Sequence, residues 1–121
     1  MQTVFFFKNM LPGEQEKLQE YCSVKLPSLE KMLSHFPPDG VILQVKGEKF
    51  RKHSAFEVEF VMKLANRTFS AKEASHMITK AVDLAKDRLV MQLKKSVYQI
   101  RRTHRSVKAR SKVKMRSSAQ V

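Results

Sequence analysis

The sequence predicts an α+β fold in which a small mixed sheet carries two helices on one face. Three observations lead to this prediction: two long stretches repeat apolar residues every three or four positions, the region between them alternates apolar and polar residues, and turn residues separate the segments. The expected order of elements is β-α-β-β-β-α. The face of the sheet that the helices leave uncovered should be exposed to water.

The first strand and the first helix are expected close together. Residues 3–8 are β-branched and aromatic, as in a short strand, and the Leu-Pro-Gly sequence at 11–13 predicts a turn. Residues 14–36 then place apolar side chains at helical spacing. Pro27 lies inside this stretch and lacks a backbone donor, so we expect a kink or a break there.

The middle of the chain alternates apolar and polar residues with a period of two, which is typical of half-buried strands. Residues 41–46 form one such stretch and residues 56–64 another, and the polar segment 47–54 between them predicts a loop. These two strands should pair antiparallel. A turn at 66–67 and a short strand at 68–71 complete the predicted sheet.

The longest amphipathic stretch, residues 75–102, predicts the second helix. Besides its apolar face it has a second stripe that repeats every seven residues, here called the heptad stripe. The heptad stripe consists of Met77, Leu84, Met91 and Tyr98. We expect it to pack against the first helix, because two helices on one sheet also touch each other. A protein-docking face is the alternative.

The charge is concentrated at the C-terminal end of the chain. With 24 Lys or Arg against 11 Asp or Glu, the net charge is +13. Asp87 is the last acidic residue, so residues 88–121, here called the basic segment, contribute +11 of that charge. Such a block indicates a surface for a polyanion, in the first place nucleic acid and less often an anionic membrane.

The chain is most simply one domain over residues 1–102 with a basic tail at 103–121, which we expect to be disordered alone. The single Cys22 cannot form an internal disulfide and lies on an apolar helical face, as a buried thiol in a reducing cytosol would. The apolar N-terminal run is too short for a signal peptide, and no segment reaches transmembrane length. We therefore expect a cytoplasmic protein without a membrane partner.

Residues 81–95, AVDLAKDRLVMQLKK, carry a family resemblance. They resemble the last helix of the short ribosome hibernation promoting factors and ribosome-associated translation inhibitors, which are similar to sigma-54 modulation proteins. That helix follows the pattern A-[IV]-D-x-x-x-D-[KR]-L-x-x-Q-L-x-K. The matching positions are Ala81, Val82, Asp83, Asp87, Arg88, Leu89, Gln92, Leu93 and Lys95. The order of elements over residues 1–102 is also similar, whereas Met77 and Thr79 stand where the family usually has Asp and Tyr.

The resemblance implies a factor that binds the small ribosomal subunit in the channel used by tRNA and messenger RNA. Such a factor contacts ribosomal RNA through basic helix faces and keeps idle ribosomes inactive. The residues agree with this chemistry, because binding to phosphate needs Lys and Arg on a rigid support. We expect phosphate contacts first from Lys94, Lys95, Arg101 and Arg102, and next from Arg88, Lys25, Arg105, Lys108 and Arg110.

No catalytic or metal site is predicted. The four histidines lack metal-ligand spacing, and the sequence contains no Gly-rich phosphate loop or nucleophile elbow. We therefore expect no enzyme activity, no cofactor and no small-molecule substrate, and a monomer when the protein is off the ribosome. Two alternatives stay open. The chain could bind other structured RNA, since double-stranded RNA-binding domains have a similar sheet-and-helices layout, or it could modulate a transcription factor through the heptad stripe.

Overall fold

The computed structural model describes residues 1–64 and 67–96 and contains the predicted order of elements. The elements are β1 (Gln2–Lys8), α1 (Pro12–Met32), the short 3₁₀ helix η1 (Pro38–Gly40), β2 (Val41–Phe50), β3 (Ala55–Leu64), β4 (Arg67–Ser75) and helix 78–96. The predicted tail at 103–121 lies outside the described residues. The chain divides into a first unit, residues 1–90, and a second unit, residues 91–121.

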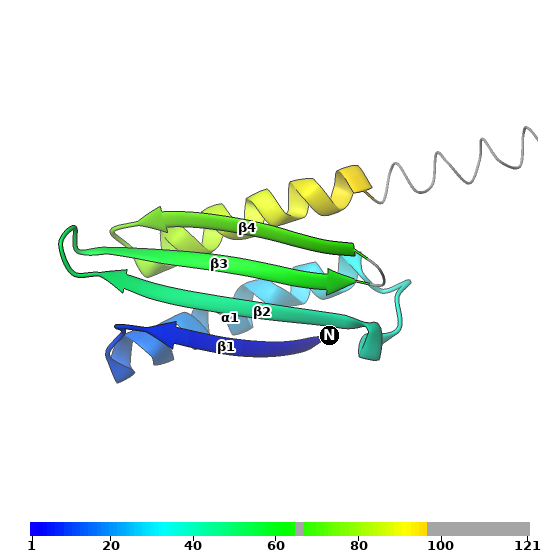
Figure 1. Cartoon of the computed structure of the whole chain (residues 1–121). Coiled ribbons are helices and arrows are strands. Elements are labelled where there is room, and N and C mark those ends of the chain that lie inside the picture. The colour runs from blue at the N-terminus through cyan, green and yellow to red at the C-terminus, as the bar shows by residue number, and fades with distance from the viewer. Residues whose placement is uncertain (65–66, 97–121) are drawn as a thin grey trace, which may run out of the picture. The chain divides into compact units, whose positions relative to one another are not determined.

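The four strands form one mixed sheet in chain order, with β1 and β4 at its edges (Figure 1). β1 pairs with β2 in parallel, with Phe5 opposite Val45, whereas β2 pairs with β3 and β3 with β4 antiparallel. The parallel pair follows from the connection, because α1 returns the chain across the sheet between β1 and β2. A short turn at 51–54 joins the antiparallel strands β2 and β3. The predicted α+β class and the antiparallel pairing of the two middle strands are confirmed.

One face of the sheet holds the core of the first unit. α1 and the start of helix 78–96 lie on the same side of the sheet (Figure 1), as predicted. The buried side chains come from alternate positions of the strands and from one face of each helix. They include Leu18, Cys22 and Leu29 of α1, Leu43, Val45, Phe60 and Met62 of β2 and β3, and Ala81, Val82, Ala85 and Leu89 of helix 78–96.

Gly47 allows α1 to approach β2 closely. A Cβ atom on Gly47 would lie 2.7 Å from Cδ2 of Leu18 and 2.8 Å from Sδ of Met10. Nonbonded carbon atoms normally stay about 3.5–4.0 Å apart, so glycine fits this position without displacing its neighbours. Gly47 is part of β2, which continues to Phe50, and the turn is confined to residues 51–54. The predicted loop at 47–54 is therefore wrong in its first half.

Glu14 fixes the start of α1. Its carboxylate accepts a hydrogen bond from the backbone N–H of Leu11 at 2.9 Å and lies 3.1 Å from Nζ of Lys49 in β2. The hydrogen bond from Leu11, supported by Lys49, holds the pKa of Glu14 below its usual value. An ionised carboxylate in the first turn also interacts favourably with the helix dipole. α1 consequently begins at Pro12, two residues before the predicted start.

Pro27 does not divide α1. We expect a kink or a break at Pro27 from the sequence; the helix is continuous from Pro12 to Met32, so the chain does not break there. Proline removes a single backbone donor, and the buried neighbours Leu26 and Leu29 hold both halves of the helix in the core. The predicted end at residue 36 is also too late, because α1 ends at Met32.

β4 is longer than predicted. It spans Arg67–Ser75 instead of residues 68–71, and the following helix begins at 78 instead of 75. As an edge strand β4 has one neighbour, and of its residues only Ala71 is buried. Charged residues can therefore occupy β4: the Lys72 side chain remains exposed, and Glu73 is paired with Arg88. Their charge makes the strand difficult to recognise in the sequence.

Candidate nucleic-acid interface

The basic residues predicted to bind phosphate fall into three groups. Lys25 and Arg88 lie in the first unit, and both contact carboxylates. Lys94 and Lys95 lie in the second unit, in the helical part that the structure describes, and both are exposed. The other five lie outside the described residues: Arg101, Arg102, Arg105, Lys108 and Arg110.

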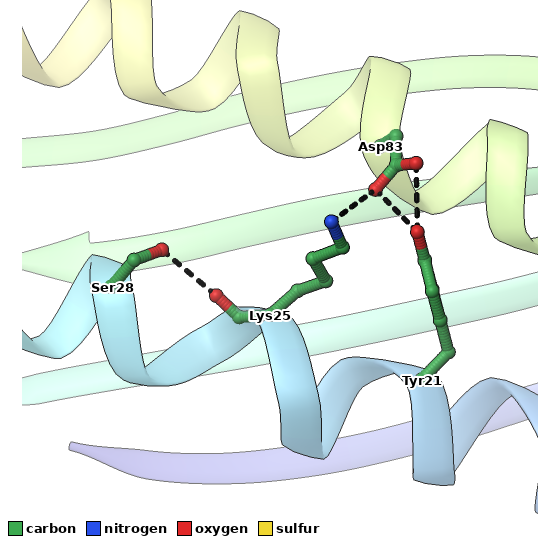
Figure 2. Close-up of polar contacts among 4 residues, drawn as sticks. All are labelled: Tyr21, Lys25, Ser28 and Asp83. Atoms are coloured by element: carbon green, nitrogen blue, oxygen red, sulfur yellow. Dashed lines mark hydrogen bonds and ion pairs between the residues drawn. The ribbon is translucent and has the colours of Figure 1, made fainter.

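Lys25 belongs to a polar cluster that joins α1 to helix 78–96. The hydroxyl of Tyr21 donates to Asp83, with 2.8 Å to Oδ1 and 2.7 Å to Oδ2, and Nζ of Lys25 lies 3.5 Å from Oδ1. The Lys25 ammonium also lies 5.4 Å from the centre of the Tyr21 ring. Figure 2 shows both side chains reaching from α1 toward Asp83. One carboxylate thus holds the two helices together and partly neutralises Lys25.

Asp83 also raises the pKa of both of its partners. Its negative charge raises the pKa of Lys25, because the ammonium is stabilised by the nearby carboxylate. The hydrogen bond to Asp83 raises the pKa of Tyr21, so the hydroxyl remains a donor. Asp83, which matches the pattern of residues 81–95, therefore has a structural role in this chain: its side chain connects two helices that lie far apart in the sequence.

Arg88 is held by β4. Its Nη1 atom lies 2.9 Å from Oε1 of Glu73 and donates a weaker hydrogen bond to the carbonyl of Lys72 at 3.3 Å. The Arg88 side chain is 60% exposed. Ion pairs at such positions contribute little to stability because water screens them. A phosphate group can therefore compete with Glu73 for the guanidinium, but Arg88 does not present a fully unbalanced positive charge.

The second unit differs from the first in its charge. Residues 91–121 contain ten Lys or Arg residues and no acidic residue, so this unit has no carboxylate of its own to neutralise them. Lys94 and Lys95 are neighbours on the helix and point about 100° apart, which spreads positive charge over a wide sector of its surface. These two lysines are the described residues that best fit the predicted phosphate contacts.

The heptad stripe does not pack as predicted. Met77 is 61% exposed, Met91 is 70% exposed, and Leu84 is exposed as well. Tyr98 lies outside the described residues. Within the first unit, the polar cluster of Asp83 makes the contact between α1 and helix 78–96 that the stripe was expected to make. The predicted packing against the first helix is therefore wrong for the described members.

The uncovered face of the sheet is nearly charge-balanced. Cross-strand ion pairs join three of its lysines to its three glutamates, at 3.6 Å for Lys8 and Glu48, 3.8 Å for Lys46 and Glu59, and 3.3 Å for Lys72 and Glu57. Lys63 lies on the same face and adds a single positive charge, so this face has little excess charge to attract a polyanion. The basic segment, which contains no acidic residue, is therefore the better candidate for binding a polyanion.

Chemically reactive groups are scarce in the described part of the chain. Over residues 1–64 and 67–96, no three His, Cys, Asp or Glu side chains gather as a metal site would require. Cys22 is buried, and burial raises the pKa of its thiol to about 12. Among the same residues, no helix has the length and apolar character needed to span a membrane.

Comparison with known proteins identifies the fold. No protein-family model matches the chain, and no curated protein sequence matches it. A ribosomal subunit interface protein from Coxiella burnetii is similar in structure, with a TM-score of 0.55, 22% sequence identity, and coverage of 81% of this chain and 99% of that chain. The N-terminal domain of Protein Y from Thermus thermophilus is similar with a TM-score of 0.58, 19% identity, and coverage of 78% and 98%.

Both solved structures belong to the hibernation-promoting factor family, which is the family that residues 81–95 resemble. The similarity extends over nearly the whole of each solved chain. The fold implied by the sequence resemblance is therefore confirmed: this chain has the fold of a ribosomal subunit interface protein and of the Protein Y N-terminal domain.

Proposed function

We propose that the chain binds the small ribosomal subunit, contacts ribosomal RNA through the basic segment, and inhibits translation by occupying the channel used by tRNA and messenger RNA. The observation that carries this proposal is the shared fold with a ribosomal subunit interface protein, in a chain whose last 34 residues contain no acid. Inhibition would be steric, since occupation of the channel requires no chemical step.

The two parts of the chain have different roles in this proposal. Residues 1–87 carry a charge of only +2 and form the folded support, whereas the basic segment supplies the phosphate contacts. Lys94, Lys95, Arg101 and Arg102 are the main contacts. Each lysine or arginine that neutralises a phosphate releases counterions, so binding should weaken steeply as salt rises.

Lys25 and Arg88 are secondary contacts. Both are paired with carboxylates in the structure, to Asp83 at 3.5 Å and to Glu73 at 2.9 Å. Binding to RNA through either residue would exchange a carboxylate for a phosphate, so its net gain is smaller than that of an unpaired cation. Substitution of these two residues should weaken binding less than substitution of Lys94 and Lys95.

Sedimentation of cell lysate tests the proposal. The protein should travel with small ribosomal subunits at low salt and move to the ribosome-free supernatant at high salt. The fourfold reversal Lys94→Glu, Lys95→Glu, Arg101→Glu and Arg102→Glu should abolish the association. The matched control reverses four exposed lysines outside the basic segment, Lys17, Lys31, Lys52 and Lys63, with the same change in net charge.

The control variant separates a specific surface from overall charge. Equal loss of binding by both variants would show that total charge alone attracts the protein to the subunit. Recovery of the wild-type protein only in the supernatant at low salt would contradict the ribosomal role. Co-sedimentation with an RNA other than that of the small subunit would favour the alternative of a binder of other structured RNA.

The exposed heptad stripe favours a second candidate function, protein docking. Met77 and Met91 are largely exposed although they are apolar, and methionine surfaces adapt well to partner proteins. In that case the chain would modulate a protein such as a transcription factor. Met91→Glu should then abolish partner binding, whereas it should leave association with the small subunit unchanged if the ribosomal proposal is right.

A further inference from the structure

β1 presents an unprotected edge of the sheet. It pairs only with β2, along its whole length from Gln2 to Lys8. Half of its backbone N–H and C=O groups therefore point away from the sheet, and within the described residues no backbone hydrogen bond outside the sheet ladder reaches them. Residues 2–7 contain no charge, no proline and no glycine. A free edge of this composition is a template for pairing with another strand.

The other edge of the same sheet is protected. β4 carries Arg67, Lys72 and Glu73 within nine residues, and such charges discourage another strand from pairing with an edge. β1 has instead two apolar side chains on the uncovered face, Val4 at 44% and Phe6 at 48% exposure. The difference between the edges indicates that pairing is hindered at β4 and open at β1.

The sequence of β1 is self-complementary in one antiparallel register. When two copies pair about a two-fold axis through Phe5, Val4 of each copy lies opposite Phe6 of the other, and Thr3 lies opposite Phe7. Residues directly opposite each other in an antiparallel pair point to the same face. The two exposed apolar side chains of each copy would therefore cover those of its partner. The only charge, Lys8, would lie opposite the neutral Gln2 at the ends of the strand.

We propose that β1 is an interface for a second copy of this chain, through antiparallel pairing centred on Phe5. The two four-stranded sheets would join into one continuous sheet with the helices of both copies on the same side. Because the axis is two-fold, the contact closes with two copies and leaves only the charged β4 edges free. This differs from the monomer expected from the sequence, and it stands independently of the proposed ribosomal function.

Two variants of the full chain with equal loss of apolar surface test the register. Val4→Lys with Phe6→Glu places opposite charges across the two-fold axis, whereas Val4→Lys with Phe6→Lys places like charges there. Opposite charges stabilise a cross-strand pair and like charges destabilise it. Because each dimer contains two such pairs, the dimer dissociation constants of the two variants should differ by about 30-fold. Sedimentation equilibrium over a concentration series measures both, and circular dichroism verifies that each variant is folded.

The expected result is a wild-type dimer, a dimer of the Lys-Glu variant and a monomer of the Lys-Lys variant. The proposal is overturned if the wild-type chain stays monomeric up to about 1 mM. At that concentration a dimer with an association free energy of roughly 4 kcal/mol would contain half of the chains. Equal association of the two variants contradicts the register, as does loss of association in both. A series of species larger than the dimer contradicts closure by the two-fold axis.

Discussion

The contact at Gly47 gives a prediction in which two Gly→Ala substitutions act with opposite sign. In Gly47→Ala the new Cβ would lie 2.7 Å from Cδ2 of Leu18, which is fully buried, and 2.8 Å from Sδ of Met10. Both distances fall about 0.7 Å or more short of normal contact. In Gly13→Ala, by contrast, the new Cβ would have no atom within 4 Å.

The magnitudes follow from these surroundings. Overpacking of this kind costs about 1–3 kcal/mol, because Leu18 or α1 must move. Gly13 lies in the first turn of α1, where alanine lowers the entropy of the unfolded chain and should stabilise the protein by about 0.4–1 kcal/mol. Urea unfolding followed by circular dichroism measures both, and with a slope of about 1.5 kcal/mol per molar the Gly47→Ala midpoint should fall by about 1 M.

A third variant tests the cause of the loss. If the clash with the sulfur atom of Met10 contributes, Gly47→Ala should cost at least about 0.5 kcal/mol less in a Met10→Ala background than in the wild-type chain, because residues in contact do not act additively. The reasoning is refuted if Gly47→Ala is as stable as the wild type, or if Gly13→Ala is destabilised as much as Gly47→Ala.

Two further predictions concern charge and burial. Glu73→Gln should release Arg88 from its 2.9 Å ion pair and strengthen binding to small subunits by about 2- to 5-fold, as measured by filter binding. Unchanged or weaker binding would contradict competition between Glu73 and phosphate for Arg88. Burial raises the pKa of the Cys22 thiol to about 12, against a value near 9 in the unfolded chain. Between these pH values the thiol keeps its proton in the folded state and loses it on unfolding, so the free energy of unfolding should fall as pH rises through this range. Cys22→Ala should flatten that decline in urea titrations at pH 8 to 11, and an identical decline in both proteins would contradict it.

The elements with strong periodicity could be predicted from the sequence. Alternation in residues 41–46 and 56–64 identified the central strands, because one face of each is buried under helices. The limits of the elements were harder to predict. The sequence predicts Gly47 in a loop, because glycine is common in loops, whereas the structure needs glycine there for close packing. The charged residues of β4 do not show the alternation of a half-buried strand, because β4 lies at an edge of the sheet.

The partners of the basic residues could not be predicted. Arg88 meets Glu73 and Lys25 meets Asp83 only because the sheet and helices bring together residues that lie far apart in the chain. The exposure of Met77 could not be predicted either, since a seven-residue repeat does not distinguish a buried stripe from an exposed one. The excess charge of the basic segment needs no tertiary structure to be recognised, because no acidic residue follows Asp87.

The salt dependence of binding to purified small ribosomal subunits tests the central proposal most directly. If Lys94, Lys95, Arg101 and Arg102 each neutralise a phosphate, the logarithm of the association constant should fall against the logarithm of the salt concentration with a slope of about −3 to −4 or steeper. Substituting glutamine at all four positions should make the slope shallower by about 3 to 4. Saturable binding with a slope near zero, or a slope unchanged in the glutamine variant, would contradict the proposal that these cations hold the chain on ribosomal RNA.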